Sequence, residues 1–177
     1  ASAHVLWEES FLGEGDEARF HTRSGLLTAL RRGNGIEMDF PSTPDSPAAE
    51  PEGLSSALGA TPSYIGRTKF DVFVEVEDEA IVRGLRPDMR RLATLGRRGV
   101  IVTAVAQSRA EAPSYDFVSR FFAPGSGVDE DPVTGSAHCA LGPHWAERLG
   151  RTSLVVFQCS SRGGIVRVDV RGDRVTL

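Results

Sequence analysis

The chain has 177 residues, of which 40% are hydrophobic and 25% charged, a composition typical of a globular protein. Its net charge of −4 gives no basic electrostatic signal, so we do not expect nucleic acid as a partner. No apolar run approaches the roughly 20 residues that cross a bilayer, and no secretory signal opens the chain, so we predict a cytoplasmic protein without membrane contact. The two cysteines, Cys139 and Cys159, have no CxxC partner and fit a reducing compartment as packed thiols.

The first 51 residues predict a helix, three strands and a linker. Residues 1–10 contain helix formers with interspersed apolar side chains, and the turn "GEGDE" follows. "RFHTRSGLLTALRR" predicts two short strands, and "GIEMDF" predicts a third, with Ile36, Met38 and Phe40 pointing inward. Four prolines between Pro41 and Pro51 make this stretch the best candidate for a domain boundary.

The remaining residues predict strands interrupted by isolated helices. We expect a short helix at 54–58, strands at "KFDVFVEV" and "AIVRGL", a helix from Pro87-Asp88 to Gly96, and the apolar strand "GVIVTAVA". "YDFVSRFFA" and an acidic loop lead to a helix at about 135–149 and two β-branched runs, "SLVVFQC" and "GIVRVDV". Strands outnumber helices and most look antiparallel, so the predicted fold class is α+β rather than a Rossmann sheet.

The acidic loop, "VDEDPVTGSAH", is the main candidate for a functional site. An EF-hand loop starting at Asp129 would need glycine where Thr134 stands and an acid where Val133 stands, so the pattern does not favour a metal. The plain alternative is a solvated turn, which is the commoner fate of three neighbouring acids.

A second interpretation of this loop is acid–base catalysis at the start of a helix. Pro132 fixes a backbone angle, Thr134 or Ser136 can cap the helix, and Gly135 lets a ligand approach the backbone. The first-turn N–H groups then offer a site for a carboxylate or a developing enolate. Burial and like-charged neighbours favour a protonated carboxyl more strongly than the helix dipole opposes it, so an enclosed Asp131 becomes a proton donor. The alternative that Asp131 merely caps the helix stays open.

Nucleophilic catalysis is less favoured by the spacing of the residues. Ser136 and His138 stand two positions apart on a helix, where side chains point away from each other. Cys139 stands among small apolar residues in the sequence, which predicts a buried thiol rather than a nucleophile. Cys159 precedes "SSRGG", which predicts a tight turn, with Arg162 as an alternative carboxylate clamp.

Ser-Ala-His occurs twice, at 2–4 and at 136–138, each time at the start of a predicted helix that carries a tryptophan, Trp7 or Trp145. Two such helices on either side of the proline-rich linker suggest a duplicated pair of helices, each wrapped by strands.

Several stretches resemble one known family. "FFAPGSGVDEDPVTGSAHCALGPHW" is similar to the signature of the PhzF-like phenazine-biosynthesis isomerases, and "QCSSRGG" resembles their next motif. "ASAHVLWEE" and "FHTRSGLLTA" resemble the segment after the family's first active-site motif, so the resemblance covers essentially the whole chain. It implies a diaminopimelate epimerase-like fold of two pseudo-symmetric, β-barrel-like domains, each around a central helix. Residues 1–45 would be the remainder of an incomplete first domain, 52–170 the second domain, and 171–177 the start of a C-terminal return.

The resemblance also implies an activity. The family carries out cofactor-independent proton transfer on a small carboxylic acid, as in the isomerisation of a dihydro-hydroxyanthranilate, and usually forms homodimers; we expect neither cofactor nor metal here. By motif, Asp131 matches the family's acidic catalytic residue, and Gly135 and Ser136 match residues that bind the substrate. We assign Thr134 and Arg162 to the same substrate. Thiol-dependent epimerases of this fold place a cysteine near this point, where the chain has Asp131-Pro132, so Cys139 does not inherit that role.

The sequence departs from the family pattern at its start. The family's catalytic glutamate motif and a Gly-His pair precede the helix that residues 1–7 represent, and neither is present, so we expect a chain without the N-terminal segment and the last strands. Two rival functions follow: a non-catalytic binding or interaction protein that keeps the fold, and a thiol-dependent racemase that uses Cys139 or Cys159.

Overall fold

The computed structural model describes residues 2–22, 25–33, 35–95, 98–107 and 114–177. Its elements, in chain order, are α1 (Ser2–Glu8), β1 (Ala18–Thr22), β2 (Gly25–Arg32), β3 (Gly35–Pro41), β4 (Ser46–Pro47), α2 (Leu54–Leu58), β5 (Tyr64–Arg67), β6 (Val72–Glu75), α3 (Glu79–Gly84), α4 (Met89–Ala93), β7 (Val100–Val105), β8 (Phe117–Ala123), the 3-10 turn η1 (Pro124–Ser126), β9 (Val128–Glu130), α5 (Gly135–Leu149), β10 (Ser153–Gln158), β11 (Gly164–Arg171) and β12 (Arg174–Thr176).

The strands of the described residues form one mixed sheet in the order β1-β2-β3-β12-β11-β10-β8-β7-β6-β5-β4, and β9 pairs with β8. Most pairs are antiparallel, whereas β6 with β7 and β8 with β10 are parallel. The predicted α+β class is therefore confirmed. The strands expected in a first and a second domain belong to a single sheet, because β12 pairs with β3 as well as with β11.

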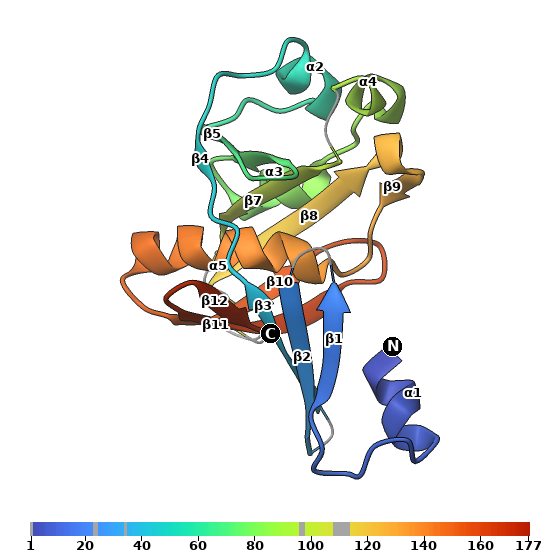
Figure 1. Cartoon of the computed structure of the whole chain (residues 1–177). Helices are drawn as coiled ribbons and strands as arrows, with labels where there is room; N and C mark the ends of the chain where they lie inside the picture. The colour runs from blue at the N-terminus through green and yellow to red at the C-terminus, as the bar shows by residue number, and fades with distance from the viewer. Residues whose placement is uncertain (1, 23–24, 34, 96–97, 108–113) are drawn as a thin grey trace.

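The central strands β6, β7 and β8 are buried on both faces. Alternate residues of β7 show this, since Val100 and Val102 pack in a core with α2, α3 and α4, whereas Ile101 packs in a second core around α5. Figure 1 shows α2 and α4 at the top of the molecule and α5 across its middle. The sheet thus separates three short helices from one long helix.

Helix α5 is buried along most of its length, as expected of a central helix. Its buried residues include Ala137, Leu141 and Trp145, which pack against side chains from β6, β7, β8, β10, β11 and β12. Trp145 Nε1 donates to Thr103 Oγ1 at 3.0 Å. Gly142 allows a close approach to β11, since a Cβ there would stand 2.8 Å from Val168 Cγ1.

The linker is bound to α5 at the point where a proline interrupts its hydrogen bonds. Pro143 has no N–H, so the carbonyl of Cys139, one turn earlier, lacks its helical donor. The backbone N–H of Thr43 donates to this carbonyl instead, at 3.0 Å. Two residues further along the linker, Asp45 Oδ1 lies 3.1 Å from His144 Nδ1. The proline-rich linker is therefore fixed to the helix that begins at the acidic loop.

A third, smaller core lies under α1. Ala3 and Trp7 pack against Ala18 of β1 and Ala29 of β2, and Ile36 and Met38 of β3 contact this cluster. The predicted inward alternation of β3 is only partly correct, because every residue of the strand after Gly35 is half-buried.

Two sequence-based assignments were wrong. "AIVRGL" was predicted as a strand and forms most of α3, which Asp78 caps by accepting a hydrogen bond from Ile81 N at 2.8 Å. Val128–Glu130 was expected to be loop and forms β9, which pairs with β8. The predicted helix ending at Gly96 is the shorter α4, and Gly96 lies outside the described residues.

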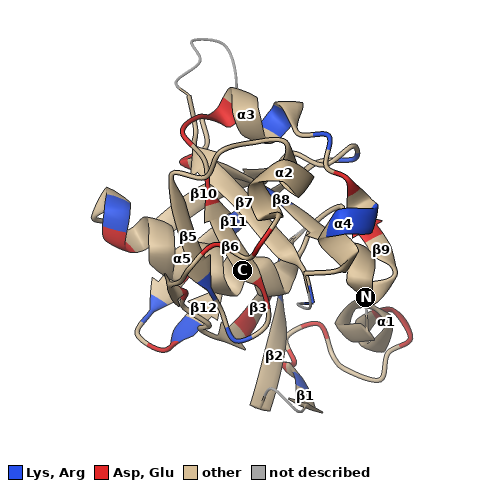
Figure 2. Cartoon of the chain, turned by 90° about the horizontal axis from the view of Figure 1, so that it is seen from above, with Lys and Arg blue, Asp and Glu red and all other residues tan. Residues whose placement is uncertain are grey.

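The charges do not segregate on the fold. Figure 2 shows basic and acidic positions interspersed around the molecule. Over the described part of the chain, no helix combines the length and apolar character needed for a membrane crossing.

Candidate functional site

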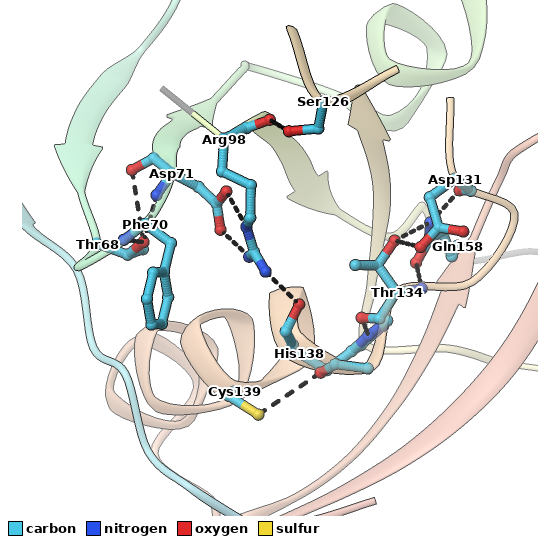
Figure 3. A network of polar contacts seen from close by, with 12 residues as sticks. Thr68, Phe70, Asp71, Arg98, Ser126, Asp131, Thr134, His138, Cys139 and Gln158 are labelled. Atoms are coloured by element: carbon cyan, nitrogen blue, oxygen red, sulfur yellow. Dashed lines mark hydrogen bonds and ion pairs between the residues drawn. The ribbon is translucent and has the colours of Figure 1, made fainter. Parts of the chain in front are cut away.

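The acidic loop meets α5 at a hydrogen-bonded relay that ends on Asp131 (Figure 3). Gln158 at the end of β10 is buried, and its Nε2 donates to Thr134 Oγ1 at 3.2 Å and to the Asp131 carbonyl at 2.7 Å. Thr134 Oγ1 donates in turn to Asp131 Oδ2 at 2.6 Å. Because the threonine hydroxyl accepts from the amide, its single proton is directed at the carboxylate.

The backbone around Asp131 is equally fixed. Asp131 N donates to the carbonyl of Phe121 in β8 at 3.0 Å, and Thr134 N donates to Gln158 Oε1 at 2.8 Å. The half-buried carboxylate is thus held from two strands and from the residue before α5. Among the described residues no hydrogen bond reaches its second oxygen, Oδ1.

The expected capping of α5 by a side chain is not what the structure shows. Thr134 is the N-cap with an extended backbone, φ −110° and ψ 98°, but its hydroxyl makes no capping bond. The hydroxyl bonds Asp131 instead, and Asp131 accepts from this hydroxyl rather than from a helix N–H. The simple explanation that Asp131 caps the helix therefore does not fit.

Gly135 and Ser136 line different hollows at the start of α5. Gly135 lines a cleft of about 610 Å³ together with Met38, Val133 and Leu177. A Cβ at Gly135 would stand 3.7 Å from Leu177 Cδ1, an ordinary contact, so the protein interior does not itself require glycine there. Ser136 is exposed and lines a cleft of about 280 Å³, whose other residues are Leu27, Phe40, Pro41, Ser42, Thr43, Lys69, Phe70 and Cys139.

Sequence reasoning missed an arginine that contacts Ser136. Arg98 Nη1 donates to Ser136 Oγ at 3.1 Å, while Nε donates to Asp71 Oδ1 at 2.9 Å and Nη2 pairs with Asp71 Oδ2. Hydrogen bonding with Asp71, which outweighs the effect of burial, raises the pKa of Arg98. Asp71 lies 27 positions before Arg98, so no pattern of neighbouring residues predicts this ion pair.

Arg162 is exposed in the turn between β10 and β11. This turn lies beside the acidic loop, since Ser160 Oγ donates to the Pro132 carbonyl at 2.7 Å and accepts from Gly163 N at 3.1 Å. The fold thus brings the turn that carries Arg162 to the loop that carries Asp131.

Both thiols are disfavoured as thiolates. Burial raises the pKa of Cys139 to about 11, and burial also raises the pKa of Cys159. These environments do not favour the thiol-dependent racemase.

His138 is fully buried and does not pair with Ser136. Its Nδ1 lies 2.7 Å from the Thr134 carbonyl, which can only accept, so Nδ1 carries the proton. Burial lowers the pKa of His138 to about 4 and keeps the ring neutral. In the part of the chain that is described, His, Cys, Asp and Glu side chains form no group of three or more that could hold a metal ion.

Comparison with known proteins identifies the family. The model of the PhzC-PhzF family, described as phenazine biosynthesis-like protein, matches residues 1–176. An uncharacterized isomerase of Halalkalibacterium halodurans is 44% identical over 178 residues, covering 100% of this chain and 66% of that protein. The mouse phenazine biosynthesis-like domain-containing protein 2 is 37% identical, with 98% of this chain and 64% of that protein covered.

Solved structures agree with these relatives. The crystal structure of a PhzF family protein of Enterococcus faecalis matches with a TM-score of 0.87 and 34% identity, over 99% of this chain and 65% of that one. The chain spans about two thirds of the length of the relatives it matches. It belongs to the PhzC-PhzF family of phenazine biosynthesis-like proteins.

Proposed function

We propose that this chain carries the α5 half of the active site of an isomerase that moves a proton on a small carboxylic acid without a cofactor. In such a reaction one carbon loses a proton, another gains one, and the double bond between them shifts, so no oxidant or reductant is consumed. Asp131 gives or takes the proton at one of these carbons. Related proteins of the family are named isomerases, which supports this reaction class.

The observation that carries the proposal is the hydrogen bond from Thr134 to Asp131 at the start of α5. A proton-transferring carboxylate must be held in one orientation, and this bond holds Oδ2 while Oδ1 remains for the substrate. Gly135 and Ser136 supply first-turn N–H groups that suit the substrate's carboxylate. The turn that carries Arg162 contacts the acidic loop through Ser160, which supports a part for this arginine in binding the carboxylate.

We also propose a division of the molecule into two units. Residues 1–45 would form the remainder of the first domain around α1, residues 52–170 the second domain around α5, and 171–177 a return strand. The separate small core of Ala3, Trp7, Ala18 and Ala29 supports this division. Such an arrangement would place the substrate between the two units, and two copies of the chain would form a homodimer.

The experiment uses the protein as its natural gene encodes it and screens for acids whose protons it exchanges with solvent. Unsaturated and amino-substituted cyclic carboxylic acids are incubated with it in D2O, and deuterium incorporation is followed by mass spectrometry. If the protein is an isomerase, we expect deuterium to be incorporated into one class of carboxylate. Binding of carboxylates without any exchange would instead support the alternative, a non-catalytic binding protein that keeps the fold.

Variants of Thr134 test the orienting hydrogen bond in the same assay. Thr134→Val removes the hydroxyl at almost constant volume and should slow exchange, whereas Thr134→Ser keeps it and should retain most of the rate. Equal rates for the two variants would show that the bond to Asp131 has no catalytic role.

A further inference from the structure

Arg98 is held in place more firmly than a surface arginine usually is. Its backbone N–H donates to the Phe70 carbonyl at 3.3 Å, and its carbonyl accepts from Ser126 Oγ at 2.9 Å. Its guanidinium forms a two-point pair with Asp71, which is only 2% exposed. The guanidinium carbon also lies over the rings of Phe70 and Phe121, at 5.2 and 5.5 Å from their centroids. The side chain therefore has one strongly preferred position.

From this position Arg98 Nη1 donates to Ser136 Oγ at 3.1 Å. A guanidinium has donors and no acceptor, so Ser136 Oγ must accept in this bond. The serine proton is then free to point elsewhere. Without the arginine, the hydroxyl could itself turn back and bond a neighbouring backbone group, as serines often do near helix ends.

The groups around Ser136 determine where its hydroxyl proton points. Ser136 is exposed and lines the 280 Å³ cleft, with Lys69 and Phe70 on the same cleft. A hydroxyl that presents its proton to such a cleft selects an acceptor oxygen in the ligand. The positive charge of Lys69 and the start of α5 favour that oxygen when it belongs to a carboxylate.

We infer that Arg98 is a positioning residue: locked by Asp71, it occupies the acceptor side of Ser136 and so turns the serine proton toward a carboxylate oxygen of the substrate. This inference rests on the proposed function, because it assigns the substrate's carboxylate to Ser136. It assigns Asp71 a supporting part, since the pair with Asp71 fixes where the guanidinium stands.

The test measures how tightly the protein, as its natural gene encodes it, binds a fluorescent probe, 2-aminobenzoate. The neutral 2-aminobenzamide is the matched ligand without a carboxylate. Wild-type protein should prefer the acid. Arg98→Met should weaken binding of the acid roughly tenfold and leave the amide little changed, as expected for losing an ordered hydrogen bond to a charged group. Arg98→Lys keeps a donor and should recover part of the affinity.

A double-mutant cycle shows whether Arg98 acts through Ser136. Ser136→Ala should weaken binding of the acid by a similar factor, and adding Arg98→Met to it should change the dissociation constant by less than about twofold. Arg98→Met is compared in the wild type and in Ser136→Ala. If it weakens binding of the acid equally in both, or in neither, the inference is wrong, although the proposed function can stand. If the wild type binds acid and amide alike and Ser136→Ala has no effect, both are wrong.

Two controls separate positioning from folding. Arg98→Met leaves the buried carboxylate of Asp71 unpaired, so Asp71→Asn/Arg98→Met is made beside it to remove that charge, and it should show the same loss of binding. Arg91→Met is the matched control, because Arg91 also donates to a serine hydroxyl, Ser56 Oγ at 3.0 Å, and pairs with an aspartate, but on α4. It should bind the probe like the wild type. A loss of affinity in Arg91→Met as large as that in Arg98→Met would overturn the inference.

Discussion

The backbone N–H of Thr43 donates a hydrogen bond to the carbonyl of Cys139, the group that Pro143 leaves without a helical donor. A proline in the middle of a helix normally costs stability because one carbonyl loses its partner. Here the lost partner is replaced by a segment almost a hundred residues earlier in the chain, so the defect in α5 is also the docking point of the linker.

Thr43→Pro should therefore destabilise the protein. It removes the N–H and leaves the Cys139 carbonyl without its donor, at a cost of about 1–3 kcal/mol in the free energy of unfolding. Thr43→Ala keeps the N–H and serves as the control. Adding Pro143→Ala to Thr43→Pro restores a helical N–H and should recover part of the loss in urea unfolding. No recovery would mean that the shared carbonyl is not the cause.

The contact of His144 with two carboxylates should make stability depend on pH. Burial disfavours the charged ring, but hydrogen bonds with Asp45 and Glu75 outweigh it and raise the pKa of His144, with Arg148 opposing. A raised folded-state pKa means that this stabilisation is complete below the ordinary histidine value of 6.5 and is lost as pH rises through the folded-state value. The difference in unfolding free energy between wild type and His144→Gln should shrink with rising pH. The exposed His21→Gln is the control, and a difference that grows with pH would contradict the assignment.

His138 should act in the opposite direction. Burial lowers its pKa from 6.5 to about 4. Between these two pH values the histidine is protonated in the unfolded chain and neutral in the folded chain. Stability should then fall as pH decreases through this interval, by about 3 kcal/mol relative to a variant that does not titrate. Urea unfolding of wild type and His138→Asn between pH 7 and pH 4 measures the difference. Parallel curves for the two proteins would show that the ring is not kept neutral by burial.

The thiols should be unreactive in the folded protein. Burial raises the pKa of Cys139 to about 11 and also raises that of Cys159, so few thiolates exist near neutral pH. Iodoacetamide should label the folded protein slowly and without loss of activity, and should label both cysteines once urea is added. Fast labelling that abolishes proton exchange would revive the thiol-dependent racemase.

The sequence predicted best what depends on neighbouring residues. Helix α5, predicted at about 135–149, spans Gly135–Leu149. The bond between Asp131 and Thr134 spans only three positions, but the sequence suggested Thr134 or Ser136 as the cap of the helix instead. Helix α3 was misassigned because Ile81 and Val82 have strand preferences, whereas its cap at Asp78 decides a helix of six residues.

Contacts between distant segments could not be predicted in the same way. Gln158 reaches Asp131 across 27 positions, and Arg98 reaches Ser136 across 38. Their partners become neighbours only when β7, β8 and β10 pair in the sheet around α5. The residue types alone gave no sign of this, since arginine and glutamine at strand ends are ordinarily solvent-facing.

The most direct test of the account compares two neighbouring acids in the acidic loop. Asp131→Asn removes the proposed proton-transferring carboxylate, and Asp129→Asn makes the same change at an exposed position two residues earlier. In the D2O assay on a carboxylate that exchanges with the wild type, Asp131→Asn should lower the rate of deuterium incorporation by about 10²–10⁴-fold, while Asp129→Asn stays within about twofold. Incorporation by Asp131→Asn at the wild-type rate would contradict the account.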